Sequence, residues 1–248
     1  MEDAVIRRFA DLAAQAERTG YYTFSGFLSE AEYAQFCAVQ QQLAAPAEAF
    51  GGHENAERLM LRFGDAAQLG YEEPFPIVCI HIAPLQDKFA DALTHRDFLG
   101  AVMHLGISRS EIGDILVHEK QAYLFCRDTM AEYICANMER IRHTSVRCRV
   151  TEALPEESAV HTEHRTVQCA SVRIDGVISK VYRISRGDCN LLFRTGKVFV
   201  NGAAVSSNSL QLRAGDKVSV RGSGKFCFCG EEGMTRKGNL LLGVDVFV

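Results

Sequence analysis

Between residues 75 and 150 the chain alternates short apolar runs with helix-forming segments, in an order that few folds accommodate. The expected elements are a strand at 75–83, a helix at 94–105, a hairpin at 112–116 and 122–126, a helix at 128–140 and a strand at 145–150. This order predicts a ferredoxin-like or RRM-like sandwich. Its strands lack the aromatic signature with which RRM strands stack bases, so the order alone does not predict RNA binding.

The first 73 residues predict a small α/β domain. Ser29 and Glu32 have the spacing of a capping box, which marks the start of a helix. The expected elements are a helix at 4–18, a strand at 21–24, a helix from Ser29 to about Leu43, and a strand or short helix at 57–63.

The whole chain is therefore expected to be an α+β protein with three domains. A polar stretch that begins at Pro155 and carries Glu156 and Glu157 is the best candidate for a linker. The expected boundaries are an N-terminal α/β domain at 1–73, a central RRM-like domain at 74–154, a linker at 155–170, and a C-terminal domain at 171–248 that ends in a β-hairpin.

Charge is divided unequally along the chain. Residues 1–170 carry 15 Lys and Arg against 25 Asp and Glu, whereas residues 171–248 carry 12 against 6. The C-terminal third is thus a basic module on an acidic body. Lys and Arg that neutralise phosphates release condensed counterions, so this asymmetry favours a polyanionic partner for the basic module.

The basic module has clear local signals. Ser185 is expected to cap a helix, with Asp188 at the third position and Arg186 in the first turn. An Arg opposes the helix dipole there, which is reasonable if a phosphate binds at that helix end. Gly196 is expected to end the helix, and Asn201-Gly202 is a strong hairpin-turn sequence.

Residues 173–222 resemble an S4 domain, the small αL RNA-binding module. The pattern is R-[LI]-D, then S-R-x-x-A-x-x-L-[IV]-x-x-G-x-V-x-V-N-G, then L-x-x-G-D-x-[IV]-x-[VI], and the chain follows it from Arg173 to Val220. It departs at Cys189, where the pattern has Ala, and at Phe193, where it has an aliphatic residue. Both are expected to be packing positions, so the departures leave the implied RNA binding intact.

The remainder resembles the YlmH-type S4 proteins of Gram-positive bacteria. The matching stretches are FGGHENAER at Phe50–Arg58, LTHRDFLGA at Leu93–Ala101 and LGISRSEIGDI at Leu105–Ile115. The resemblance implies a cytoplasmic factor that binds rRNA on the large ribosomal subunit and acts in the rescue of stalled translation. It also implies contacts with peptidyl-tRNA. The RNA-contacting residues that it implies are Arg173, Lys180, Arg183, Ser185, Arg186, Lys197, Asn201 and Arg221.

A second RNA contact is considered at Thr94, His95 and Arg96, where the alternative is simply a capped helix start. Two other classes of function remain open. One is an RNA-modifying enzyme with an S4 appendage, either a pseudouridine synthase or an rRNA methyltransferase. The other is a cell-division accessory protein.

The enzyme alternative has little support in the sequence. Asp175 falls in the S4 pattern and not in a catalytic domain, and no glycine-rich turn follows a convincing strand. The Gly222–Lys225 run has Phe226 where a P-loop needs Ser or Thr. No nucleophile with a base is recognisable, so no catalytic residue and no cofactor are expected.

The cellular setting follows from the termini and the cysteines. Met1-Glu2-Asp3 is unlike a signal peptide, and no apolar run approaches the roughly 20 residues that span a bilayer, so neither secretion nor a membrane partner is expected. The nine Cys are expected to be reduced, and His161 and His164 to be a linker pair and not metal ligands. No DNA partner is expected.

Overall fold

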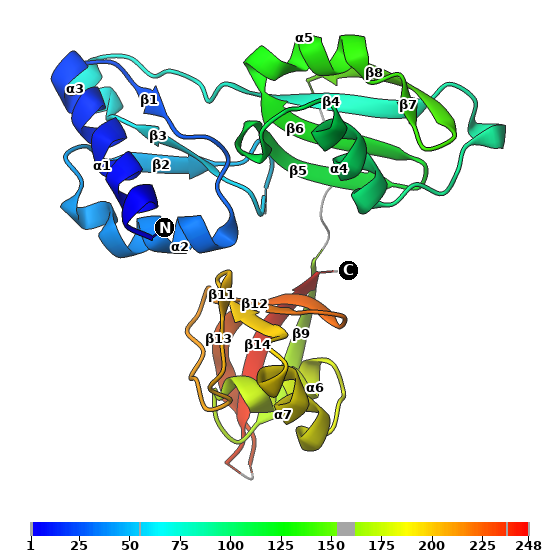
Figure 1. Ribbon diagram of the computed structural model, residues 1–248. Coiled ribbons are helices and arrows are strands. Elements are labelled where there is room, and N and C mark those ends of the chain that lie inside the picture. Colours follow the sequence, from blue (N-terminus) through cyan, green and yellow to red (C-terminus); the bar gives the residue numbers. More distant parts are fainter. Residues whose placement is uncertain (1, 55, 153–161, 237, 248) are drawn as a thin grey trace. The chain divides into compact units, whose positions relative to one another are not determined.

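The computed structural model describes residues 2–54, 56–152, 162–236 and 238–247. The chain divides into two compact units, one with the described residues up to 152 and the other with those from 162 onward (Figure 1). No helix among these described stretches is both long and apolar enough to cross a membrane.

The N-terminal half of the first unit packs its helices on a three-stranded sheet of order β1-β3-β2. Ser29 and Glu32 form the predicted capping box. The rings of Phe9 and Phe63 each meet the ring of Phe36 edge to face, which fixes the core of this half. The elements are α1 (Glu2–Thr19), β1 (Thr23–Phe24), α2 (Glu30–Val39), a 3₁₀ turn (Gln40–Gln42), β2 (Ala47–Phe50), β3 (Met60–Phe63) and α3 (Ala66–Leu69).

The central half has the predicted order of elements. Strands β5-β6-β4-β8-β7 form an antiparallel sheet, and apolar side chains such as Ile80, Phe98 and Ile134 fill the layer between the sheet and helices α4 and α5. The elements are β4 (Ile77–Pro84), α4 (His95–His104), β5 (Ile112–His118), β6 (Gln121–Arg127), α5 (Asp128–Asn137), β7 (Arg140–Ile141) and β8 (Thr144–Thr151), with 3₁₀ turns at Asp87–Phe89 and Arg109–Glu111.

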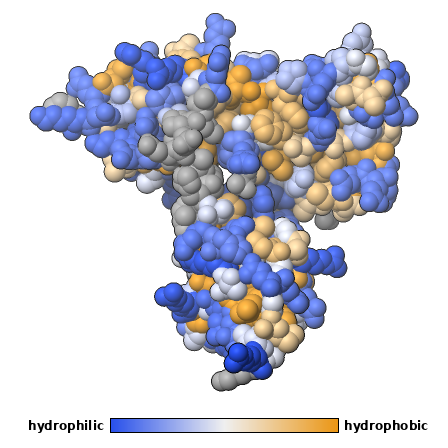
Figure 2. Space-filling model, turned by 180° about the vertical axis from the view of Figure 1, so that it is seen from behind, coloured by the Kyte–Doolittle hydropathy of each residue, from blue (hydrophilic) through white to orange (hydrophobic). Residues whose placement is uncertain are grey.

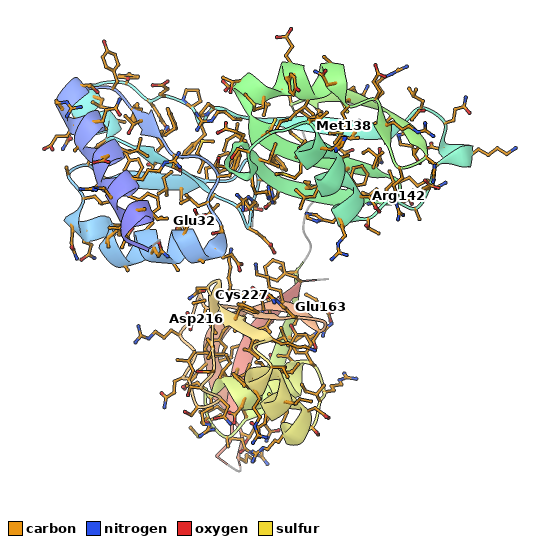
Figure 3. The ribbon with its side chains drawn as sticks, viewed as in Figure 1. Glu32, Met138, Arg142, Glu163, Asp216 and Cys227 are labelled. Atoms are coloured by element: carbon orange, nitrogen blue, oxygen red, sulfur yellow. The ribbon has the colours of Figure 1, made fainter. Side chains whose placement is uncertain are left out.

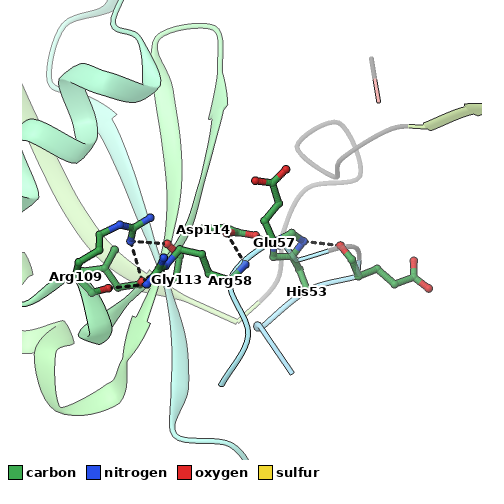
Figure 4. Close-up of polar contacts among 8 residues, drawn as sticks. His53, Glu57, Arg58, Arg109, Gly113 and Asp114 are labelled. Carbon is green, nitrogen blue, oxygen red and sulfur yellow. Dashed lines mark hydrogen bonds and ion pairs between the residues drawn. The ribbon is translucent and has the colours of Figure 1, made fainter. Parts of the chain in front are cut away.

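A polar cluster joins the two halves into one compact unit (Figure 4). The guanidinium of Arg58 donates to the backbone carbonyls of Ile112 (2.9 Å), Phe27 (2.9 Å) and Arg109 (3.1 Å). Burial lowers the pKa of Arg58 and brings that of Arg109 down to about 10. The nearby carboxylate of Asp114 favours the charged form of both arginines.

Asp114 also holds the loop that precedes β3. Its carboxylate accepts hydrogen bonds from the backbone N–H groups of Glu57 (2.6 Å) and Arg58 (3.1 Å) and lies 3.1 Å from Nε2 of His53. Two of the stretches that carry the family resemblance, 50–58 and 105–115, therefore meet here, and their polar residues hold the unit together.

The second unit packs two helices against a six-stranded sheet of order β11-β10-β12-β13-β14-β9. In α6, the side chains of Ile174, Val177, Ile178 and Val181 recur at helical spacing and are all buried. The elements are β9 (Thr162–Cys169), α6 (Ile174–Val181), α7 (Arg186–Arg194), β10 (Val198–Val200), β11 (Ala203–Ala204), β12 (Lys217–Val220), β13 (Gly224–Met234) and β14 (Leu240–Phe247).

The predicted linker at 155–170 is wrong for residues 162–169. They form β9, which pairs with β14 from Leu240↔Cys169 to Phe247↔Thr162. His164 is accordingly a strand residue and not part of a linker pair, whereas His161 and the rest of 155–161 lie outside the described residues. An edge strand needs apolar side chains on one face only, and most residues of β9 are exposed, so its sequence looks like a polar linker.

The two departures from the S4 pattern are packing positions, as expected. Cys189 and Phe193 lie one turn apart on α7 and are both buried in the core of the second unit. All nine cysteines are free thiols, and four of them are buried. Burial raises the pKa of Cys79 and Cys126 to about 12, so these thiols stay protonated and inert.

Candidate nucleic-acid interface

The turn between α6 and α7 presents basic side chains to solvent. Helix α6 ends with Arg183 in the left-handed region (φ 53°), and the N–H of Ile184 donates to the carbonyl of Ser179 (3.1 Å). Glycine is the usual residue at such a position, because a side chain there is strained. Two residues later Ser185 caps α7, so Arg183 and Arg186 flank the start of this helix.

The first of two hollows beside α6 has a volume of about 780 Å³ and is lined by Arg173, Lys180 and Arg186. Arg173 forms a two-pronged ion pair with Asp175, with distances of 2.9 and 3.1 Å. Burial alone would raise the pKa of Asp175, but the hydrogen bonds from Arg173 and from the N–H of Gly176 hold it below its ordinary value. This hollow therefore contains one neutralised and two unneutralised cations.

The second hollow, of about 920 Å³, is lined by Arg165, Lys180 and Arg183, and also by Glu163, which forms an ion pair with Arg165. Because Lys180 lines both hollows, the two form a continuous basic surface, which we define by Arg165, Arg173, Lys180, Arg183 and Arg186. Lys180, Arg183 and Arg186 are exposed and make no ion pair with the described part of the chain. Hydrophilic residues surround smaller hydrophobic patches on the face of this unit that Figure 2 shows.

Two of the predicted contact residues have structural tasks. The hydroxyl of Ser185 accepts from the N–H of Asp188 (3.1 Å) and donates to its carboxylate (2.7 Å). The amide of Asn201, a residue with φ 49°, donates to Asp216 (2.9 Å) and accepts from the N–H of Lys217 (2.9 Å). Both side chains are thus engaged in holding their own turns.

Lys197 and Arg221 form a separate group. The N–H of Arg221 donates to the carbonyl of Lys197 (2.9 Å), and its guanidinium lies 4.5 Å from the ring centroid of Phe199. Neither residue is among those that line the two hollows. The structure therefore brings together Arg173, Lys180, Arg183 and Arg186 but does not add Lys197 and Arg221 to them.

In the central half, the side chain of Thr94 serves the helix cap. Its N–H and hydroxyl both donate to Asp97 (2.8 and 2.7 Å), and Asp97 pairs with Arg142 (3.1 Å). These hydrogen bonds from Thr94, together with the charge of Arg142, lower the pKa of Asp97. His95 and Arg96 are exposed.

Arg96 does lie in a basic setting. It lines a hollow of about 550 Å³ with His104, Arg140 and Arg142, the last of which Figure 3 labels on the β7–β8 hairpin, and the acidic residues Asp97 and Glu139 line the same hollow. Arg142 is also left-handed (φ 53°). This group spans α4 and β7, so the sequence stretch 94–96 alone could not identify it.

Sequence reasoning also missed three residues of the basic surface and its rim. Arg165 and Gln168 come from β9, and Asn239 precedes β14. The signal for Arg165 is the alternation of β9, which places it on the same face as Val167 and Cys169, and these two pack inward. A reading of 162–169 as an edge strand would have placed Arg165 beside α6.

Comparison with known proteins bears on the first unit and on the whole chain. Residues 71–154 match the family model described as "Putative RNA-binding domain in YlmH". The chain is also 28% identical, over 236 residues, to a Bacillus subtilis (strain 168) protein named "Ribosome-associated protein quality control protein P2". The matched region covers 93% of this chain and 91% of that protein.

A solved structure is also similar. It is titled "Cell division protein ylmH from Streptococcus pneumoniae" and matches with a TM-score of 0.49 and 18% sequence identity. The match covers 60% of this chain and 90% of that one.

Proposed function

We propose that this protein is a non-enzymatic RNA-binding protein of the ribosome. In this proposal the second unit is an S4 domain and the central half of the first unit is an RRM-like domain. The observation that carries it is the basic surface, where Arg173, Lys180, Arg183 and Arg186 converge on the α6–α7 turn. The match of residues 71–154 to a domain described as RNA-binding supports the same class of partner.

The basic surface suits the backbone of folded RNA. Its cations come from strand β9, from helices α6 and α7 and from the residues that flank α6, so they are spread over two hollows and can contact several phosphates. A-form RNA is recognised mostly through its phosphates and 2′-hydroxyls. Recognition by shape and charge, with little sequence preference, is the expected result.

Large ribosomal subunits that carry peptidyl-tRNA are the proposed target. The name of the Bacillus subtilis relative, a ribosome-associated quality-control protein, supports a ribosomal target in general, and the relative aligns with nearly the whole chain. The central half would then provide a second contact, in which Arg96 acts with Arg140 and Arg142. A cytoplasmic location is part of the proposal.

Sedimentation with purified large subunits over a range of salt concentrations tests the proposal. The native chain is expected to co-sediment at low salt and to be released as salt rises, because phosphate contacts depend on counterion release. Lys180→Ala combined with Arg186→Ala should abolish co-sedimentation. Arg213→Ala is the matched control, since Arg213 is exposed in the same unit but lines neither hollow. If the double variant and Arg213→Ala were released from the subunits at the same salt concentration, the assignment of the basic surface would be overturned.

A further inference from the structure

Metal-ligating side chains gather on the six-stranded sheet of the second unit. His164 of β9 lies directly opposite Asp245 of β14, and Cys229 comes from the next strand, β13. One ligand atom from each of these three residues lies within 4.8 Å of the others. Figure 3 labels Glu163 and Cys227, strand neighbours of two of them, at the same end of this unit.

Two irregularities in β13 deliver side chains to this cluster. Phe228 pairs with Val244 and Gly230 with Gly243, so Cys229 is an extra residue in the strand. The next shift, between Glu231 and Gly233, makes Glu232 a second extra residue. Bulges of this kind re-aim side chains and are common beside functional sites. Here both extra residues, Cys229 and Glu232, lie beside His164.

Glu232 is held in a defined position beside the imidazole of His164. Its Oε1 lies 2.8 Å from Nε2 of His164, and the hydroxyl of Thr166 donates to its Oε2 (2.8 Å). Gly243 leaves the space that this carboxylate fills, since a Cβ there would fall 2.2 Å from Oε1. The other imidazole nitrogen, Nδ1, lies 2.7 Å from Oδ1 of Asp245.

We propose that His164, Cys229 and Asp245 bind a divalent transition metal of the zinc class. Nitrogen, sulfur and carboxylate ligands together select zinc over magnesium or calcium, which prefer oxygen alone. Nδ1 of His164 would bind the metal, while Nε2–H donates to Glu232, the carboxylate partner that metal-bound histidines usually have. Because the His164 and Asp245 side chains are 53% and 38% exposed, a fourth position is open to water.

A simple ion pair between His164 and its two carboxylates is the competing explanation. In that explanation the thiol of Cys229 is a protonated hydrogen-bond donor, to the carboxylate of Asp245 and to the carbonyl of Cys227 (3.8 Å), whereas in a metal site its sulfur is a ligand. The thiol therefore distinguishes the two explanations, and Cys229→Ser is the decisive variant.

Titration with Co²⁺, a spectroscopic substitute for zinc, tests the site in the full chain. The protein is used without an affinity tag, reduced, and treated with a chelator. We expect one equivalent to bind with a thiolate-to-cobalt charge-transfer band that is lost in Cys229→Ser. Cys227→Ser is the matched control, since it lies on the same strand two residues away, and it should keep the band.

Two further measurements distinguish the loss of a metal ligand from a failure of the variant to fold. Zn²⁺ should raise the melting temperature of the native chain, whereas Mg²⁺ should not, and Asp245→Asn should remove this shift while its circular dichroism stays native. Glu232→Gln should weaken Co²⁺ binding about 10- to 100-fold, as expected for an outer-shell partner. Absence of stoichiometric binding, or a band that survives in Cys229→Ser, would overturn the proposal.

Discussion

Two arginines of the first unit and two of the second have opposite roles. In the first unit Arg58 and Arg109 are half-buried, and their guanidinium groups donate to backbone carbonyls. In the second unit Arg183 and Arg186 are exposed and make no ion pair with the described chain. A cation whose donors are already satisfied holds the fold together, whereas one that is free at a hollow can bind a ligand.

This difference corrects an easy inference from family resemblance. Arg58, Arg109 and Asp114 lie in the stretches that resemble the YlmH-type proteins, and the two arginines could be taken for RNA contacts from their charge alone. The structure uses all three residues to join the halves of the first unit. Resemblance therefore includes residues that hold the architecture together, and burial and hydrogen-bond partners identify them.

The largest expected effect is that of Asp114→Ala. The change leaves two half-buried arginines without their carboxylate and two N–H groups without their acceptor, so we expect the first unit to lose about 3 kcal/mol of unfolding free energy. Denaturant unfolding measures it. Asp114→Asn keeps an acceptor and should lose less. A loss below about 1 kcal/mol in the Ala variant would contradict the structural role of the cluster.

The next effect concerns binding alone. We expect Lys180→Ala with Arg186→Ala to reduce the slope of log affinity against log salt by about two, roughly one per lost phosphate contact. Filter binding with a structured rRNA fragment measures the slope. Denaturant unfolding should show native stability, since both side chains are exposed. An unchanged slope would show that the two cations touch no phosphate.

Arg183→Gly should separate stability from binding. Glycine relieves the left-handed backbone at φ 53°, so we expect the second unit to gain about 1 kcal/mol of unfolding free energy. RNA binding should weaken in the same variant, because a cation of the basic surface is lost. Arg183→Lys is the control, which keeps both the strain and the charge. A variant that is stabilised and binds normally would remove Arg183 from the interface.

The smallest effect is expected for Lys197→Ala. Lys197 is exposed and does not line either hollow, so we expect native stability and a smaller change in salt slope than for Lys180→Ala. The same filter-binding series measures both variants. An equal or larger effect of Lys197→Ala would extend the interface to the strand β10 side and restore the prediction from the sequence.

Local sequence signals predicted the central half well because its elements obey simple rules. The strands carry alternating or continuous apolar residues, and Thr94 starts a helix as its capping pattern indicates. The predicted order is found in β4, α4, β5, β6, α5 and β8, but α5 ends at Asn137 and the short strand β7 (Arg140–Ile141), which was not predicted, follows it. The strand β9 was missed because an edge strand with one wet face has almost the composition of a linker.

The site was predictable only in part for a related reason. The α6–α7 turn is a local feature, so Ser185 and Arg186 could be placed from sequence. Arg165 reaches the same surface from β9, and Cys229 and Glu232 reach His164 through bulges in β13. Register shifts depend on how a strand meets its neighbours, and no single segment encodes them.

The ion pair between Arg173 and Asp175 has a consequence for ligand choice. A free phosphate or a mononucleotide must displace the carboxylate with a single anionic group, whereas a polynucleotide engages Lys180 and its neighbours at the same time. Competition with the carboxylate of Asp175 therefore weakens the binding of ligands with one anionic group more than that of multivalent ligands. We expect the abundant small phosphates of the cell to compete poorly for this module, so that it remains available for long chains.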